Sequence, residues 1–138
     1  MGSDGDYRRG RHVVSALRVH LVFVTKYRRG VLDDEMLTCC EDAMRKVCGN
    51  FEAALREFNG EADHVHLLVE YPPKVSVSAL VNSLKGVSAR RLRSEYTGRV
   101  NRARMNGHFW SPSYFAASCG GGPLSIIRQY IEQQRRPA

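Results

Sequence analysis

Two histidines separated by one residue are the first group in this sequence whose type and spacing suggest chemistry. They lie in the segment 63–69, which reads DHVHLLV. Side chains alternate between the faces of a strand, so His64 and His66 face one side while Val65 and Leu67 face the core. Two strand rises separate the roots of the histidines by roughly 6–7 Å, which allows both imidazoles to bind one metal ion. Because the pattern is short, a pair of surface histidines on a half-exposed strand is an equal alternative.

A metal site needs another ligand, and the last helical pattern offers one. Tyr130 and Gln134 are four residues apart, so they share one face of a helix. A tyrosine hydroxyl has an ordinary pKa of about 10 and is a poor nucleophile near neutral pH. Beside a divalent cation that polarises a phosphate, however, it can attack phosphorus. Taken alone, Tyr130 is more simply a half-buried helix tyrosine, and only its coincidence with the histidines and a basic surface favours chemistry.

The positive charge of the chain is concentrated in its second half. The formal net charge is +7, but residues 1–84 are nearly neutral and residues 85–138 contain only two acids, Glu95 and Glu132. Segregated basic charge suits a polyphosphate partner, because each neutralised phosphate releases counterions. A solvated basic surface or attraction to anionic lipid is the alternative interpretation. The residues we expect to contact DNA are Arg8, Arg9, Arg11, Lys26, Arg28, Arg29, Lys85, Arg90, Arg91 and Arg93.

Several classes of protein are disfavoured by composition. A chain of 138 residues is sufficient for one domain. The most apolar stretch, Val13 to Thr25, contains Arg18 and His20, so we expect no membrane span. The first residues lack an apolar signal region, and the cysteines form no C-x-x-C pair, so we expect a cytoplasmic protein with reduced thiols. The GGG run lacks the Gly-Lys-Ser/Thr of a phosphate loop, so we expect no ATP site.

The elements that must position these groups follow from periodicity and turn residues. Asn59-Gly60 is expected to form a turn, and Gly49-Asn50 to end the first helix. The order β-α-β-β-α-β-α predicts an α+β fold, a ferredoxin-like split βαβ antiparallel sheet with an added C-terminal helix. Strands are expected at Ala16–Lys26, Phe51–Phe58, His64–Tyr71 and Phe109–Ser118, and helices at 32–47, 75–96 and 124–135.

We expect residues 1–138 to form a single domain with four accessory parts. These are a basic arm at 1–12, a polar connection at 97–107, a glycine hinge at 120–122, and the tyrosine helix within 123–136.

Five stretches, in this order, carry a resemblance to a known family. They are VHLVFVTKYRRGVL at 19–32, DHVHLLVEYPP at 63–73, LKGVSARRLRSEY at 84–96, FWSPSYFAAS at 109–118 and IIRQYIEQQ at 126–134. Over nearly its whole length the chain resembles the HUH-type single-tyrosine transposases of the smallest bacterial insertion sequences (the 200/605 family) and their REP-associated relatives. The histidine triplet followed at this distance by Tyr-Ile-Glu-x-Gln is the most specific part of the match.

The resemblance implies roles for individual residues. His64, His66 and the amide of Gln134 would hold Mg²⁺ or Mn²⁺, and Tyr130 would be the nucleophile. The family often has Asn before the glutamine, where this chain has Gln133, and the four-residue spacing favours Gln134 as the ligand. The resemblance also implies a ferredoxin-like fold and a homodimer, with active sites that we expect to be assembled in trans.

The function we expect is a metal-dependent transposase that cleaves and rejoins single-stranded DNA through a 5′-phosphotyrosine and recognises hairpins at element ends. It would need no ATP and would act in a bacterial or archaeal cytoplasm, associated with the nucleoid. One alternative is a non-catalytic ferredoxin-like module that binds nucleic acid. Another is a domesticated REP-type single-strand nuclease.

Overall fold

A four-stranded antiparallel sheet organises the chain. The computed structural model describes residues 8–9, 14–118 and 124–134. The sheet has the order β4-β5-β3-β6, which is the ferredoxin-like arrangement predicted from the sequence. Its strands are β3 (Leu17–Val24), β4 (Ala54–Glu61), β5 (His64–Tyr71) and β6 (Phe115–Ser118).

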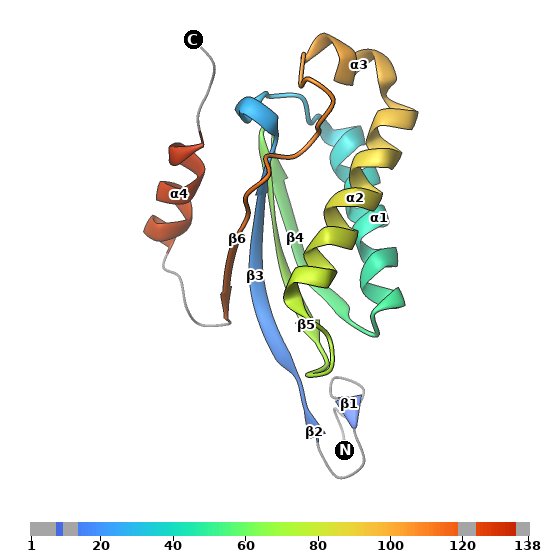
Figure 1. The fold of residues 1–138 in the computed structure, drawn as a ribbon, viewed down its shortest axis with the longest axis vertical. Coiled ribbons are helices and arrows are strands. Elements are labelled where there is room, and N and C mark those ends of the chain that lie inside the picture. The colour runs from blue at the N-terminus through green and yellow to red at the C-terminus, as the bar shows by residue number, and fades with distance from the viewer. Residues whose placement is uncertain (1–7, 10–13, 119–123, 135–138) are drawn as a thin grey trace.

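Helices cover both faces of this sheet, but only one face carries the main core. The long helices α1 (Asp34–Asn50) and α2 (Val77–Glu95) lie side by side on one face, and α4 (Leu124–Gln133) lies beyond the other face (Figure 1). Side chains of Leu21, Phe23 and Val65 are fully buried beneath α1 and α2. The cysteines Cys39, Cys40 and Cys48 are free and buried in this core.

Polar side chains fix where the two long helices begin. The Asp33 carboxylate accepts a hydrogen bond from the Met36 amide at 2.9 Å, and the Ser76 hydroxyl accepts one from the Ala79 amide at 3.3 Å. Both are N-cap interactions that satisfy amides which the helix itself leaves unpaired. The helix α2 therefore starts at a defined place relative to the sheet, and its basic residues have a defined position.

Three further elements connect or extend the sheet. A short pair, β1 (Arg8–Arg9) and β2 (Val14–Ser15), is antiparallel. The turn η2 (Lys26–Arg28) follows β3, and α3 (Thr97–Arg102) lies within the polar connection expected at 97–107. Among the described residues, no helix is long and apolar enough to cross a membrane.

One of the two glycine signals was read wrongly. Asn59 and Gly60 do not turn but lie inside β4, paired with His66 and Val65, and the chain reverses at residues 62–63 instead. Gly60 serves close packing rather than a turn, since a Cβ there would lie 2.5 Å from Leu37 Cδ2. The Gly49-Asn50 signal did mark the end of the first helix, although α1 runs three residues beyond the expected Val47, to Asn50 itself.

Two strand predictions were displaced. The second strand begins at Ala54 rather than Phe51, because Glu52 has a positive φ of 59° that an extended strand excludes. The fourth strand was expected from Phe109 but begins at Phe115, and before it Trp110 forms only an isolated bridge with Thr25. The glycine hinge at 120–122 and most of the basic arm at 1–12 lie outside the described residues.

Candidate active site

His64 and His66 lie together on the sheet face opposite α1 and α2. Their ring centroids are 5.9 Å apart, and the ring planes are inclined by only 27°. The residues that alternate with them, Val65 and Leu67, belong to the core on the other face. His66 is half-buried. Burial is the main cause that lowers the pKa of its imidazole, and the nearby His64 lowers it further, which favours the neutral form that binds metals.

The carboxylate of Asp63 contacts the ring of His64. Asp63 Oδ1 lies 2.9 Å from His64 Nδ1, and the second oxygen, Oδ2, accepts a hydrogen bond from Arg28 Nε at 3.1 Å. Partial burial of Asp63 opposes ionisation, but the hydrogen bonds from His64 and Arg28 outweigh it and lower the pKa of the carboxyl. This arrangement makes His64 less exposed than expected for a residue that does not face the core, at 9%.

Tyr130 and Gln134 share one face of the α4 end, as their spacing predicted, and both contact the segment before β6. The Tyr130 hydroxyl is 2.9 Å from Ser113 Oγ. The amide oxygen of Gln134 accepts hydrogen bonds from Ser111 Oγ at 3.2 Å and Ser113 Oγ at 3.3 Å. Burial raises the pKa of Tyr130, and the Ser113 hydrogen bond partly offsets that. A serine pair therefore holds both functional groups of α4.

The register of the sheet puts Tyr130 on the same face as the histidines. The Tyr130 ring packs against Phe115 with centroids 5.7 Å apart. Phe115 pairs with Val22, and Val22 pairs with His66, so the three side chains form one row across neighbouring strands. Two strand spacings separate the ends of this row by roughly 10 Å at the backbone. The α4 end is therefore two strands from His66 and on its side of the sheet.

The donor atoms available for a metal ion are limited. Within the described part of the chain, no three His, Cys, Asp or Glu side chains are grouped so that they could hold a metal ion, and a third ligand among those residues would be a donor of another type. The amide oxygen of Gln134 is such a donor. Within the described residues, the Gln134 side-chain oxygen accepts from the hydroxyls of Ser111 and Ser113, and its nitrogen donates to the Tyr130 carbonyl oxygen, so the amide does not contact the histidines. Two imidazoles and an amide nevertheless fit the donor chemistry of a divalent ion.

Lys85 holds the serine segment in place. Its ammonium group, half-buried under the sheet edge, donates to the carbonyl oxygens of Ser111 at 2.7 Å, Pro112 at 3.3 Å and Ser113 at 3.4 Å. Burial lowers the pKa of Lys85. Trp110 anchors the same segment, because its indole N–H donates to the buried Ser88 hydroxyl at 3.0 Å. Lys85 thus contacts protein carbonyls in the structure, although its sequence context suggested DNA.

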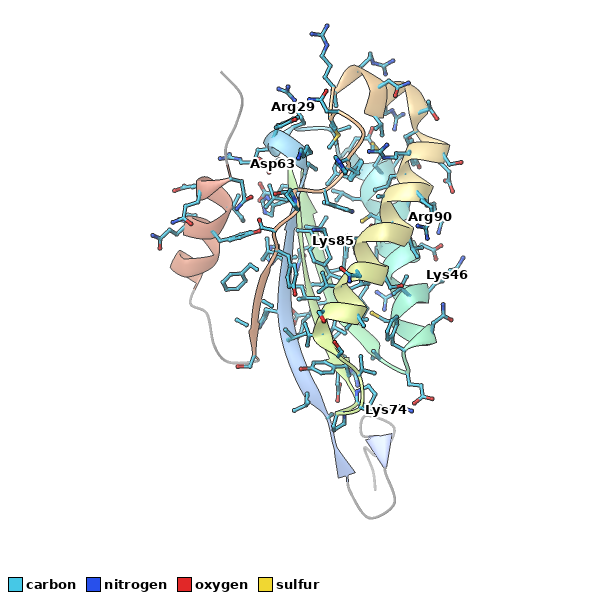
Figure 2. All side chains as sticks on the ribbon, in the orientation of Figure 1. Arg29, Lys46, Asp63, Lys74, Lys85 and Arg90 are labelled. Carbon is cyan, nitrogen blue, oxygen red and sulfur yellow. The ribbon has the colours of Figure 1, made fainter. Side chains whose placement is uncertain are left out.

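The remaining basic residues fall into two groups. Lys26, Arg28 and Arg29 lie in and after η2, and Arg28 and Arg29 line one cavity with Asp63. Figure 2 shows Arg29 and Asp63 at the same end of the sheet. Arg90 and Arg93 lie on α2, on the opposite side of the sheet, where they line a cavity of about 420 Å³ with Trp110. The residues expected to bind DNA are therefore not all brought together.

Several of these residues already have protein partners. Arg91 forms ion pairs with Asp42 at 2.6 Å and Glu95 at 2.9 Å, and Arg28 is paired with Asp63. Lys26 and Arg29 instead contact the ring of Tyr27: Lys26 Nζ is 5.2 Å and Arg29 Cζ is 5.5 Å from the ring centroid. Arg11 and the side chains of Arg8 and Arg9 lie outside the described part of the chain.

Sequence reasoning missed three of the residues that contact the site. Asp63 had a detectable signal, because it directly precedes His64 and a carboxylate beside a metal-binding histidine commonly orients the ring. Ser111 and Ser113 had none, since their contact with Tyr130 and Gln134 depends on how α4 lies against the sheet.

Comparison with known proteins decides the family. The model of the family described as "Transposase IS200 like" matches residues 13–134. The chain belongs to the IS200-like transposase family. Two curated relatives agree. The ISDra2 transposase TnpA of Deinococcus radiodurans is 31% identical over 94% of this chain and 91% of its own length. The transposase for insertion sequence element IS200 of Salmonella typhimurium is 32% identical over 94% of this chain and 84% of its own.

Two solved structures are similar to this IS200-like transposase. A crystal structure of a proposed transposase from Deinococcus radiodurans R1 superimposes with a TM-score of 0.86 and 33% identity, covering 94% of this chain and 99% of that one. A REP-associated tyrosine transposase bound to a REP hairpin gives a TM-score of 0.56 at 12% identity, over 92% of this chain and 69% of that one. The second comparison supports the shared fold alone.

Proposed function

We propose that this transposase cleaves and rejoins single-stranded DNA with Tyr130 as the nucleophile. The observation that carries the proposal is the placement of Tyr130 on the sheet face that bears His64 and His66, within a chain of the IS200-like family. The Tyr130 oxygen would attack a backbone phosphorus, forming a 5′-phosphotyrosine and releasing a 3′-hydroxyl. A 3′-hydroxyl would later attack the phosphotyrosine, restoring a phosphodiester and freeing the tyrosine. Because the bond energy is kept in the covalent link, no ATP is needed.

His64, His66 and Gln134 are proposed to hold Mg²⁺ or Mn²⁺. The parallel imidazoles supply two nitrogen ligands from one strand, and the Gln134 amide supplies an oxygen from the same helix end as Tyr130. When bound, the ion would polarise the scissile phosphate and stabilise the charge that develops on its oxygens. For Gln134 to reach that ion, its amide must leave the hydroxyls of Ser111 and Ser113.

Lys26 and Arg29 are the basic residues best placed to contact the DNA strand beside the histidines. They lie in and after η2, the turn whose Arg28 contacts Asp63, and no ion pair among the described residues neutralises their charges. Phosphate contacts of this kind hold the strand in register without reading its sequence. A structural neighbour with the same fold is bound to a REP hairpin, and we propose a hairpin as the DNA partner of this chain as well.

A homodimer is proposed because strand transfer needs two cut ends held together and each chain has one candidate tyrosine. Two-fold symmetry is the common arrangement for two such sites. We further propose that α4 of each chain completes the active site of its partner. In the single chain, Tyr130 contacts Ser113 and Phe115 of its own sheet, so this step requires α4 to move.

A cleavage assay with a labelled single-stranded hairpin tests the proposal. Cleavage by the wild type should require Mn²⁺ or Mg²⁺, and Tyr130→Phe should abolish it while hairpin affinity stays within a few-fold. His64→Ala and His66→Ala should each lose the metal-dependent cleavage. Tyr96→Phe, which removes a hydroxyl at the far end of α2, is the matched control and should cleave normally. Cleavage that persists in Tyr130→Phe, or in the presence of a chelator, would contradict the proposal.

Mixing two inactive variants tests assembly in trans. Chains carrying Tyr130→Phe are combined with chains carrying both His64→Ala and His66→Ala. If α4 completes the partner's site, each mixed dimer holds one intact site and regains cleavage. If each chain completes its own site, no mixed dimer has an intact site and the mixture stays inactive. A monomer in light scattering at micromolar concentration would contradict the dimer itself.

The non-catalytic nucleic-acid-binding module remains an alternative that the same assay separates. If the protein is a binding module, the wild type will bind the hairpin but will give no cleavage product under any metal condition. No particular contact in the structure favours it over the transposase.

A further inference from the structure

The turn that follows β3 is tied to the residue that precedes β5. Thr25 is fully buried, and its amide donates to the carbonyl oxygen of Asp63 at 3.0 Å. Its hydroxyl lies 2.7 Å from the Arg29 carbonyl oxygen and 3.2 Å from that of Asp63. The Leu32 amide donates to the Ala62 carbonyl at 2.9 Å, which holds the other side of the same reversal. The backbone of Asp63 is therefore fixed from β3 and from the segment that leads into α1.

The backbone of this turn is strained at the residue that reaches Asp63. Tyr27 and Arg28 have positive φ values of 59° and 55°, a region that non-glycine residues rarely occupy. Such strain persists only where surrounding contacts over-determine it, and it is concentrated at functional sites. Here the contacts are the Arg28 amide to Thr25 at 2.8 Å and the Arg29 amide to Lys26 at 3.2 Å. The left-handed conformation directs the Arg28 side chain to the Asp63 carboxylate.

The chemistry of that carboxylate decides which nitrogen of His64 carries the hydrogen. Asp63 is the ionised partner of Arg28, and a carboxylate can only accept hydrogen bonds. The 2.9 Å contact between Asp63 Oδ1 and His64 Nδ1 is therefore made by an N–H on Nδ1. In the neutral ring the lone pair is then on Nε2, and Nε2 is the only nitrogen left for a metal ion.

We propose that Arg28 and Asp63 are positioning residues for His64, which fix its ring orientation and its Nδ1–H tautomer so that Nε2 is the ligand atom. The use of that atom rests on the metal site proposed above. Arg28 acts through Asp63: its guanidinium keeps the carboxylate in one rotamer, and the carboxylate holds the imidazole. Of the two adjacent arginines, Arg28 positions the Asp63 carboxylate and Arg29 contacts DNA phosphates.

The first test needs neither metal nor DNA. Nitrogen-15 NMR of the histidine rings in the full chain at pH 8 reports which ring nitrogen carries hydrogen. The wild type should show His64 with hydrogen on Nδ1, and Asp63→Ala should lose that preference. Arg28→Gln should weaken it, and Arg28→Lys should fall between Arg28→Gln and the wild type. Arg29→Gln, the matched control at the neighbouring position, should leave the His64 signals unchanged.

A second measurement follows the metal alone. Free Mn²⁺ in equilibrium with the protein, measured by electron paramagnetic resonance, should show binding weakened about 10–100-fold by Asp63→Ala, the range typical of groups that orient a metal ligand. Arg28→Gln should weaken it in the same direction, and the double variant should bind no worse than Asp63→Ala. Arg29→Gln should bind Mn²⁺ like the wild type.

The outcomes separate this inference from the function it rests on. Hydrogen on His64 Nε2 in the wild type, or signals unchanged by Asp63→Ala, would overturn the positioning role. Equal, additive losses from Arg28→Gln and Asp63→Ala would overturn the action of Arg28 through Asp63. A lowered melting temperature in Arg28→Gln with an unchanged tautomer would reduce Arg28 to a structural residue. A wild type with the Nδ1–H tautomer but no Mn²⁺ binding would instead contradict the proposed metal site.

Discussion

Replacing Ser88 by alanine should destabilise the protein, because it removes the hydrogen-bond acceptor of the buried Trp110 indole. Ser88 is fully buried in α2, and its hydroxyl accepts the indole N–H of Trp110 at 3.0 Å while donating to the Leu84 carbonyl at 2.7 Å. Trp110 is only 5% exposed and packs against Phe23 and Phe109, so water cannot replace the lost acceptor. The variant therefore leaves a buried donor without a partner.

The expected magnitude follows from two opposing effects. An unsatisfied buried donor costs about 1–3 kcal/mol of the free energy of unfolding. Alanine is a better helix former than serine, which returns about 0.5 kcal/mol. Ser88→Ala should therefore lower the free energy of unfolding by about 0.5–2.5 kcal/mol, without a change in the urea m-value. The control is Ser94→Ala, an exposed serine of the same helix, which gains the helix preference and loses no buried contact.

Trp110 is the only tryptophan in the chain, so its fluorescence reports this transition directly. Urea unfolding of Ser88→Ala, Ser94→Ala and the wild type is followed by fluorescence and circular dichroism in parallel. The reasoning would be refuted by a Ser88→Ala midpoint equal to that of Ser94→Ala. It would also be refuted by a red-shifted native spectrum at unchanged stability, since that would mean water already reaches the indole.

Three further predictions concern packing, thiols and pH. Gly60→Ala should lower the free energy of unfolding by about 1–3 kcal/mol, because its Cβ would lie 2.5 Å from Leu37 Cδ2 and 3.0 Å from Val65 Cγ1. The control is Gly49→Ala, whose Cβ would have no atom within 4 Å and which should be neutral or stabilising in the same denaturation assay. Burial raises the pKa of Cys48 to about 11 and that of Cys40 still further. In a Cys119→Ser background, both thiols should therefore react with a thiol reagent at pH 8 only as fast as the protein unfolds. Rapid labelling of either thiol would contradict its burial. Hydrogen bonds from Arg91 and Lys46 lower the pKa of the Asp42 carboxyl, so this carboxylate stabilises the fold above its unfolded pKa of about 3.9, and the effect is lost as the pH falls through the folded value. Arg91→Gln should therefore lower the melting temperature at pH 7 and have a smaller effect at pH 2; an equal loss at both would contradict the ion pair.

The sequence predicted correctly the elements in which apolar residues recur on one face that packs into the core. The strand His64–Tyr71 was predicted with its observed bounds, because Val65, Leu67 and Val69 alternate into the core and Pro72 follows directly. The order of elements then led to the ferredoxin-like sheet. Asn59-Gly60 failed as a turn because its preference for a turn is local, while the pairing of β4 with β5 and the space required beside Leu37 are not.

The candidate site was predictable in its residue types but not in its supporting contacts. His64 and His66 share one face because they are two residues apart on a strand, and Tyr130 and Gln134 share one face because they are four residues apart at the end of a helix. The role of Lys85 was not predictable, because its partners are backbone carbonyls of residues 111–113, which carry no sequence signal. The same holds for Arg28, whose reach to Asp63 depends on a left-handed backbone that its residue type does not favour.

The central claim is that Tyr130 forms a covalent bond to a DNA 5′-phosphate. The most direct measurement is mass spectrometry of the peptides recovered after incubation with a cleavable single-stranded hairpin and Mn²⁺. The account predicts that the peptide containing Tyr130 gains the mass of the 5′-phosphorylated nucleotide that remains after nuclease digestion. It also predicts that Tyr130→Phe yields no modified peptide, while Tyr96→Phe yields the wild-type result. A nucleotide attached to any other residue, or cleaved DNA without a covalent peptide, would contradict the account.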